Sequence, residues 1–338
     1  MTAVLLVGTG EVAVRAARQL LDTPGLDRLF VAGRDEGRAR EIADALGPTM
    51  EAVPWPAVGD DGVPHGTDAV AVAVPAGAAL EWARRAVRAG VHAAVVADTD
   101  DDLGALLALD DDARRAGVTL AVGCGLVPGL GDVLARHAAD ILDRADEVHV
   151  ARTGAAGPAC VDALRRARHE RALEWHDGAW HTSRKLGPLL VWFPDPVGAR
   201  ECEVAAAGAS VLLQAVPGAG RVTVRVDEPP VRSPTRALVT RKPLDSGWGA
   251  ARVEVWGWRG AERVPVVYGV VDRTAVAAGT VLGVTAARLA GLLPSIALRA
   301  DPASGARGLG ALVEPTPFLA ELARRGVKAA KFEGVPVG

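Results

Sequence analysis

The sequence predicts an α/β protein with two parts: a doubly wound parallel sheet and an inserted α+β domain built on a mostly antiparallel sheet. Three observations support this fold class. Short apolar segments alternate with helical patterns over the first 123 residues. A glycine-rich loop joins the first predicted strand to the first predicted helix. The composition changes after residue 145, and six of the eight tryptophans lie between 175 and 258.

Length and composition set the class of protein. A chain of 338 residues usually forms two structural units. Hydrophobic residues make up 49% and charged residues 23%, with 38 Lys and Arg against 41 Asp and Glu, which excludes disorder and a basic nucleic-acid footprint. The three cysteines form no CxxC pair, so we expect reduced thiols and no metal site. The N-terminal residues favour a strand over a signal peptide, and we expect a cytoplasmic protein without membrane contact.

The first domain is predicted over residues 1–123. Its apolar strands are 4–7, 29–32, 51–53, 69–74, 92–97 and 119–122. Its helices are 11–21, 35–46, 79–89 and 101–116. Strands that are apolar along nearly their whole length predict a parallel sheet that helices cover on both faces.

The inserted domain is predicted over residues 124–271. β-branched and aromatic residues alternate in 222–226, 252–256 and 264–270, which predicts an antiparallel sheet. We expect the exposed face of this sheet to pair two copies of the chain as a homodimer.

The last part of the chain, residues 272–338, is predicted as helices that complete the first domain. Segment 275–293 is nearly all apolar, but Gly279, Gly283 and Arg288 interrupt it. We therefore predict a buried helix, capped at its start by Asp272, and not a membrane span.

The loop GTGEVA at residues 8–13 follows the first strand and opens the first helix. Gly8 allows a tight turn, Gly10 lets the backbone approach a pyrophosphate, and the helix N-terminus attracts its charge. This strand, loop and helix predict a Rossmann-type dinucleotide site, which also includes Thr9, Glu11 and Val12. A purely structural turn is the alternative.

The end of the second strand bears on the choice of cofactor. NAD-binding folds usually place an acidic residue there to hold the ribose 2′-hydroxyl, but this chain has Gly33 followed by Arg34. Gly33 leaves room for a 2′-phosphate, and Arg34 can pair with it. We therefore expect NADPH as cofactor. Asp35 leaves NAD possible if the register of the loop shifts by two residues.

The ends of later strands should meet at the same edge of the sheet, where ligands bind. The fourth strand ends in Val74, Pro75 and Ala76, and Pro75 makes this a stiff surface for the ribose or nicotinamide. The fifth strand ends at Asp98, the acidic candidate for proton transfer. The alternative is that Asp98 caps the next helix.

The junction between the two predicted domains is rich in glycine. Its sequence, GCGLVPGLGD at residues 123–132, lets a ligand approach the backbone closely, so we predict Gly125, Pro128 and Gly129 as substrate contacts. A helix that begins near Gly131 would direct its amides at a substrate carboxylate. Cys124 is a candidate proton donor, and a buried, inert thiol is the alternative.

Four further residues are candidates by chemical type. His92 can handle a proton, although it begins a strand. Arg200, Arg241 and Lys242 can bind the anionic group of a substrate.

Several motifs together resemble the saccharopine dehydrogenase-like oxidoreductases. They are the GTGEVA loop, AGVH at 89–92, DDARRAGV at 111–118, GCGLVPGL at 123–130, VYGVVD at 267–272 and PFLAELARRG at 317–326. The junction motif is the most specific, although this chain has Val127 where the family often has Asp. The resemblance implies an NAD(P)-binding Rossmann domain, an inserted sheet domain that often forms the dimer, and hydride transfer at a carbon bonded to an amino-acid nitrogen.

These observations lead to one expected function and one alternative. We expect an NADPH-dependent oxidoreductase that transfers a hydride to or from a C=N or C=O carbon of a small, carboxylate-bearing, amino-acid-like substrate. The alternative is a catalytically inactive NADP-binding sensor or scaffold. No GxSxG motif occurs in the sequence, which disfavours a serine hydrolase.

Overall fold

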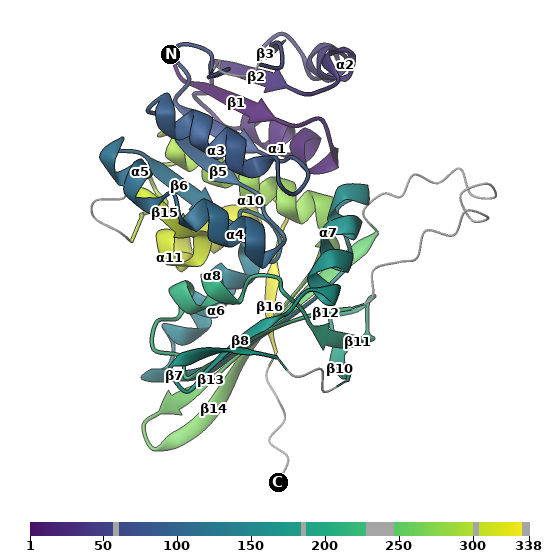
Figure 1. The fold of residues 1–338 in the computed structure, drawn as a ribbon, viewed down its shortest axis with the longest axis vertical. Helices are drawn as coiled ribbons and strands as arrows, with labels where there is room; N and C mark the ends of the chain where they lie inside the picture. Colours follow the sequence, from purple (N-terminus) through teal and green to yellow (C-terminus); the bar gives the residue numbers. More distant parts are fainter. Residues whose placement is uncertain (57–60, 184–186, 228–246, 300–303, 333–338) are drawn as a thin grey trace, which may run out of the picture.

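The computed structural model describes residues 1–56, 61–183, 187–227, 247–299 and 304–332. Figure 1 shows the first sheet with its helices at the top and the long strands β13 and β14 of a second sheet below. The predicted fold class is confirmed, since a parallel sheet with helices is joined to a mostly antiparallel one.

The first sheet has strand order β15-β6-β5-β4-β1-β2-β3, and every pairing within it is parallel. Its strands are β1 (Ala3–Val7), β2 (Arg28–Ala32), β3 (Met50–Ala52), β4 (Ala69–Val72), β5 (His92–Val95), β6 (Thr119–Val122) and β15 (Gly305–Gly308). The chain runs outward from β1 to β3 and then returns to β4. The order therefore reverses between β1 and β4, which is where ligands bind in open α/β sheets.

The helices around this sheet largely follow the predicted ranges. They are α1 (Glu11–Leu21), α2 (Glu36–Leu46), α3 (Ala79–Arg88), α4 (Asp100–Leu107), α5 (Asp110–Arg115) and α10 (Thr274–Leu289). The predicted helix 101–116 is divided into α4 and α5. The Asp110 carboxylate accepts a hydrogen bond from the Ala306 amide at 3.0 Å, so α5 is directed toward β15.

Helix α10 crosses back onto the first domain and packs against α1. A Cβ atom on Gly279 would lie 2.4 Å from Arg15 Cβ, and one on Gly283 would lie 2.8 Å from Gln19 Cβ. The two glycines therefore let the helices approach closely. Asp272 does not cap this helix, because β14 continues to Arg273 and α10 begins directly after it. Among the helices of the described residues, none is long and apolar enough to cross a membrane.

The second sheet has the order β10-β11-β12-β7-β13-β14-β16, with the hairpin β8–β9 attached to β12. Its strands are β7 (Arg144–Thr153), β8 (Leu173–His176), β9 (Ala179–Thr182), β10 (Leu189–Trp192), β11 (Ala199–Val204), β12 (Arg221–Asp227), β13 (Trp248–Arg259), β14 (Glu262–Arg273) and β16 (Ala329–Phe332). All pairs are antiparallel except β7–β12. The sequence assigned residues 272–338 to the first domain, but β16 pairs with β14 in the second sheet.

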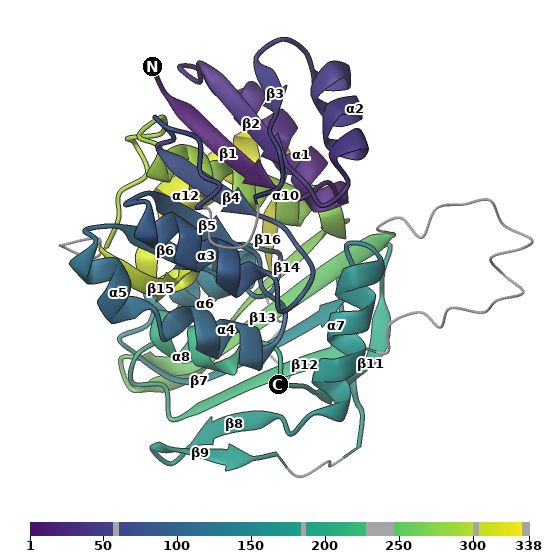
Figure 2. The ribbon, with the colours of Figure 1, turned by 45° about the horizontal axis from the view of Figure 1, so that its top comes forward.

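The remaining helices are α6 (Leu130–Ala139), α7 (Pro158–His169), α8 (Ala209–Ala215), α11 (Leu309–Leu312) and α12 (Pro315–Arg324). Buried residues of α6 and of the second sheet, such as Leu134 and Val253, belong to one apolar core that also includes Leu6 of β1. In Figure 2, α7 lies beside β11 and β12 at the side of the molecule where the two sheets meet. The core thus continues from one sheet to the other.

The edge strand β10 exposes large apolar side chains, including Leu189, Leu190 and Trp192. Exposed apolar side chains on a sheet edge are compatible with pairing between copies. The homodimer stays a prediction.

Asp132 is a fully buried carboxyl group in the first turn of α6. Its Oδ2 accepts a hydrogen bond from the Gly129 amide at 2.8 Å, and its Oδ1 has no hydrogen-bond partner within the described residues. Burial raises the pKa of Asp132 to about 8. The folded protein therefore keeps a proton here between about pH 4 and pH 8, where the unfolded chain has lost it.

We predict that Asp132→Asn flattens the pH dependence of stability. In the wild type, the free energy of unfolding should fall by roughly 1 kcal/mol per pH unit through that window because of this group. The amide cannot ionise, and its oxygen can still accept from Gly129. Denaturant unfolding between about pH 5 and pH 8 measures the effect, with the exposed Asp44→Asn as control. An unchanged slope in Asp132→Asn contradicts the assignment.

Candidate functional site

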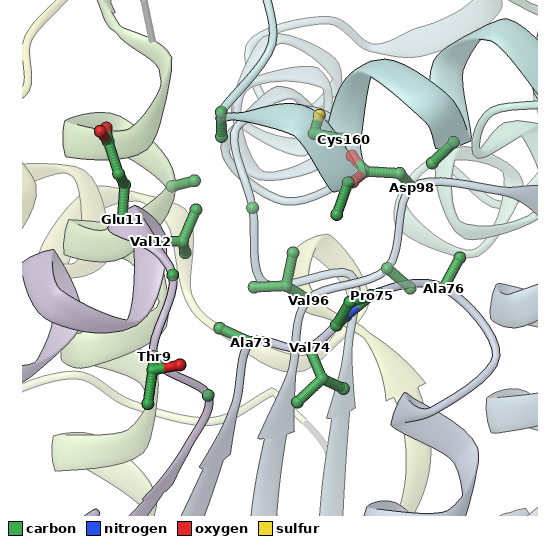
Figure 3. Close-up of a pocket in the computed structure, with 18 of the residues that line it drawn as sticks. Thr9, Glu11, Val12, Ala73, Val74, Pro75, Ala76, Val96, Asp98 and Cys160 are labelled. Carbon is green, nitrogen blue, oxygen red and sulfur yellow. The ribbon is translucent and has the colours of Figure 1, made fainter. Parts of the chain in front are cut away.

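The carboxyl ends of β1, β2, β4 and β5 open into a cleft of about 310 Å³ between the two domains. The first domain contributes the loops that follow these strands, and the second domain contributes the end of β7 and the start of α7. Figure 3 shows Thr9, Glu11 and Val12 on one side of the cleft and Asp98 and Cys160 on another.

Gly8 forms the tight turn after β1. Its φ angle is +126°, and a Cβ atom there would lie 2.1 Å from the Ala73 carbonyl oxygen. Its amide donates to the Ala32 carbonyl at 2.9 Å, so the turn is held against β2. No side chain fits at this position, which agrees with the predicted requirement for glycine.

Gly10 is the N-cap of α1 and has an extended backbone that any residue can adopt. A Cβ atom on Gly10 would meet nothing within 4 Å, since its Cα borders the open cleft. Thr9, Glu11 and Val12 line the cleft beside it. The first amides of α1 thus lie beside a space free of side chains, which fits the pyrophosphate of a dinucleotide.

The predicted nucleotide-selecting residues Gly33, Arg34 and Asp35 line the same cleft. A Cβ atom on Gly33 would lie 2.4 Å from Thr9 Cγ2, so the loop after β1 lies tightly against Gly33. The Asp35 carboxylate accepts from the Arg38 amide at 2.9 Å and caps α2. The Asp35 carboxylate is therefore engaged as a helix cap, whereas the exposed Arg34 lines the cleft.

Val74, Pro75 and Ala76 line the cleft as the sequence predicts, and Figure 3 places them near Val96 at the end of β5. The next amide, that of Gly77, donates to Asp102 Oδ1 at 3.0 Å. The loop after β4 is therefore attached to α4.

Asp98 follows β5 and lines the cleft, but it does not cap α4. Thr99 is the N-cap, and its hydroxyl accepts from the Asp102 amide at 3.3 Å. The Asp98 carboxylate instead accepts a hydrogen bond from Arg152 Nη1 of β7 at 3.0 Å. The side chain of Arg152 is 2% exposed and that of Asp98 is 21% exposed, so the carboxylate still reaches the cleft.

Arg152 has three further partners. Nη1 donates to the Val127 carbonyl, and Nη2 donates to the Gly154 carbonyl at 3.3 Å and to Cys160 Sγ at 3.6 Å. Burial by itself would lower the pKa of Arg152. The interactions with Cys160 and Asp98 have a larger effect, so the pKa of Arg152 is raised. Burial also raises the pKa of the Cys160 thiol to about 12. The cleft therefore holds a charged guanidinium beside a neutral thiol at neutral pH.

Two of the three predicted catalytic residues do not line the cleft. Cys124 is fully buried, and its thiol donates to the Ala121 carbonyl at 3.4 Å. Burial raises the pKa of Cys124 to about 12, as expected of the inert thiol that was the alternative. His92 begins β5, at the opposite end from the cleft, and its Nδ1 accepts from the Thr119 amide at 2.9 Å. Burial lowers the pKa of His92. The positions of both side chains support structural roles.

Of the three predicted substrate contacts at the domain junction, one lines the cleft and two do not. Gly125 lines the cleft with its neighbour Leu126, but Pro128 and Gly129 do not. The Gly129 amide already donates to Asp132, so this hydrogen-bond donor at the start of α6 has its partner within the protein. It is not available to a ligand.

Of the three predicted anion-binding residues, the structure describes Arg200, which does not line the cleft. Arg200 lies on β11 outside it, and its guanidinium donates to the neighbouring Ala199 carbonyl at 2.9 Å. Arg241 and Lys242 lie outside the described residues.

Several cleft residues were missed by the sequence analysis. Among them are Trp55, Ala73, Val96, Ala97, Arg152, Ala156, Ala159, Cys160, Ala163, Thr274 and Ala278. Trp55 could have been found, since it stands between Pro54 and Pro56, three residues after a strand that ends at this edge. The residues of β7, α7 and α10 reach the cleft only through the packing of distant segments, which leaves no local sequence signal.

Comparison with solved structures finds the same two-part fold in dehydrogenases. Saccharopine dehydrogenase (L-Glu forming) from Saccharomyces cerevisiae aligns with a TM-score of 0.68 at 13% identity, over 98% of this chain and 100% of that one. The DAP dehydrogenase of C. glutamicum, in complex with DAP, aligns with a TM-score of 0.55 at 14% identity, over 96% and 99%. A probable dehydrogenase from Thermotoga maritima gives 0.51 at 12% identity, over 97% and 98%.

No protein-family model and no curated protein sequence matches the chain. The structural likeness supports the predicted resemblance at the level of the fold: this chain has the fold of two-domain dehydrogenases.

We predict that Gly10→Val blocks the dinucleotide without unfolding the protein. The valine side chain would extend into the open cleft, and the backbone at Gly10 suits any residue. NADPH affinity should fall at least about tenfold while the melting temperature stays close to that of the wild type. Nicotinamide fluorescence and thermal melting measure the two effects.

Gly104→Val is the matched control, because a Cβ on Gly104 also meets nothing within 4 Å and Gly104 does not line the cleft. Wild-type NADPH affinity in Gly10→Val contradicts a pyrophosphate site at this loop.

Proposed function

We propose that the protein is an NADPH-dependent oxidoreductase that transfers a hydride to or from a C=N or C=O carbon of a small, carboxylate-bearing, amino-acid-like substrate. One observation carries the proposal: the glycine turn, Arg34 and Asp98 line one cleft at the point where the strand order reverses. The shared fold with dehydrogenases supports it.

The residues around the cleft fit NADPH, which supplies a hydride when bound. Gly8 and Gly10 leave space for the pyrophosphate beside the first amides of α1. The Arg34 guanidinium is the partner for the 2′-phosphate. Pro75 and Val96 border the part of the cleft next to Asp98 and suit the nicotinamide end.

Asp98 is the residue that we assign to the substrate. Its carboxylate favours a positive charge on a nearby C=N nitrogen, which makes the bonded carbon a better hydride acceptor, and it can take a proton from an amine in the reverse direction. The hydrogen bond from Arg152 fixes the orientation of this carboxylate. Leu126, Ala159 and Ala163 form an apolar wall that limits water near the reacting group.

We predict that Arg34→Ala weakens NADPH binding selectively. Loss of a charge-assisted hydrogen bond to the 2′-phosphate should cost about 1.5–3 kcal/mol, or roughly 10-fold to 150-fold in affinity. NADH has no 2′-phosphate, so its affinity should stay the same. Titrations that follow nicotinamide fluorescence measure both dissociation constants.

Arg38→Ala is the control, because Arg38 is an exposed arginine of α2 that pairs with Glu41 at 3.1 Å and does not line the cleft. Equal losses for both nucleotides in Arg34→Ala contradict the assignment. Tight NADPH binding without turnover of any imine, amine or carbonyl compound would instead support the sensor or scaffold.

A further inference from the structure

Trp55 lines the same cleft as Arg34 and Asp35, and it follows β3, the strand that pairs with β2. It comes three residues after the end of β3, and its side chain is only partly buried. The proposed hydride transfer gives this residue no role. A large aromatic side chain that borders a ligand cleft is costly to leave in water, so its position calls for a physical reason.

The Trp55 ring packs against a side chain of α3. It packs edge to face with Trp82, with 5.1 Å between the ring centroids and an interplanar angle of 74°. Trp82 is buried, and the Arg85 guanidinium lies 5.6 Å from its ring centroid. Arg85 in turn pairs with Glu81 at 3.1 Å. A continuous series of contacts therefore packs the Trp55 ring against α3, while Trp55 also lines the cleft.

The backbone next to Trp55 is restrained by two prolines and by a hydrogen bond at Val53. Pro54 and Pro56 restrict the chain on both sides. The Val53 amide donates to the Val31 carbonyl at 2.9 Å, so the segment begins attached to β2. A Cβ atom on Gly62 would lie 2.4 Å from Pro56 Cβ, so Gly62 lies close to Pro56. These restraints lower the conformational entropy that the segment around Trp55 would lose when a ligand binds.

We propose that Trp55 is a binding residue for the adenine ring of the dinucleotide. This inference rests on the proposed function, which assigns Arg34 to the phosphate on the adenosine ribose. The adenine is bonded to that same ribose, so it must lie near Arg34. Trp55 is the aromatic residue at this end of the described cleft, and a flat, uncharged base stacks well on such a ring.

Arg34 and Trp55 should contribute to nucleotide binding in different ways. Arg34 distinguishes NADPH from NADH because only one of them has the 2′-phosphate. Adenine is common to both, so Trp55 should strengthen the binding of both nucleotides by the same factor. A Trp55 side chain that served only to pack against Trp82 would affect stability and leave both affinities unchanged.

The test uses two probes that contain adenine and lack nicotinamide: adenosine 2′,5′-bisphosphate and ADP. Calorimetric titration of Trp55→Ala should give about 5-fold to 150-fold weaker binding of both probes, the range found for base stacking on aromatic side chains. Trp55→Phe should retain affinity within about threefold, since the phenyl ring still stacks.

The second measurement is tryptophan fluorescence. Either probe should quench the wild type, and the quenching should be lost in Trp55→Phe. Trp180→Phe is the matched control, because Trp180 makes a similar edge-to-face pair with Trp175, at 5.2 Å and 68°, and does not line the cleft. This control should bind and be quenched like the wild type.

The outcomes are distinct. Wild-type affinity in Trp55→Ala, or wild-type quenching in Trp55→Phe, overturns the adenine contact while the proposed function stands. If Trp55→Ala does not fold, the quenching of Trp55→Phe decides. If the wild-type protein binds neither probe, NADPH nor NADH, the proposed function fails and the adenine contact fails with it.

Discussion

The buried ion pair between Arg152 and Asp98 is the contact on which the cleft depends. Removing a guanidinium from water costs several kcal/mol, and a buried arginine is tolerated only when its hydrogen bonds are largely satisfied. Here Asp98, two backbone carbonyls and the Cys160 sulfur surround it. These partners come from the loop after β5, the domain junction, the end of β7 and the start of α7. Their relative positions are therefore fixed by one side chain, which also orients the acidic group of the cleft.

The local parts of the fold could be predicted from the sequence, and the parts that depend on distant packing could not. Apolar strands alternate with amphipathic helices in the first domain, and the tight turn at Gly8 has a positive φ angle that favours glycine, so these predictions agree with the structure. Arg152 looks like any strand arginine until the two sheets pack together. The break between α4 and α5 lies at Ala108 and Leu109, where nothing in the sequence interrupts a helix. His92 is different, since its place at the start of a strand already put it at the far edge of the sheet.

The two ends of the cleft are built in different ways. At the proposed nucleotide end, the glycine turn, Arg34 and Trp55 come from the loops after β1, β2 and β3 of one domain, and most of this end was visible in the sequence. At the proposed substrate end, Asp98 belongs to the first domain, whereas Arg152 and α7 belong to the inserted one. Helix α10 follows the inserted domain and packs on α1 through Gly279 and Gly283, which connects the second sheet to the cofactor loop. The inserted domain thus contributes directly to the proposed substrate end and is linked to the cofactor loop through α10.

A crystal structure of the protein with NADPH tests the central claim most directly, because it shows where each end of the cofactor lies. The account predicts pyrophosphate density beside Gly10 and the nicotinamide ring near Pro75 and Val96, with Asp98 facing the open side of that ring. The Arg152 contacts should be unchanged. Nucleotide density elsewhere, or a nicotinamide ring remote from Asp98, would contradict the assignment of this cleft as the site of hydride transfer.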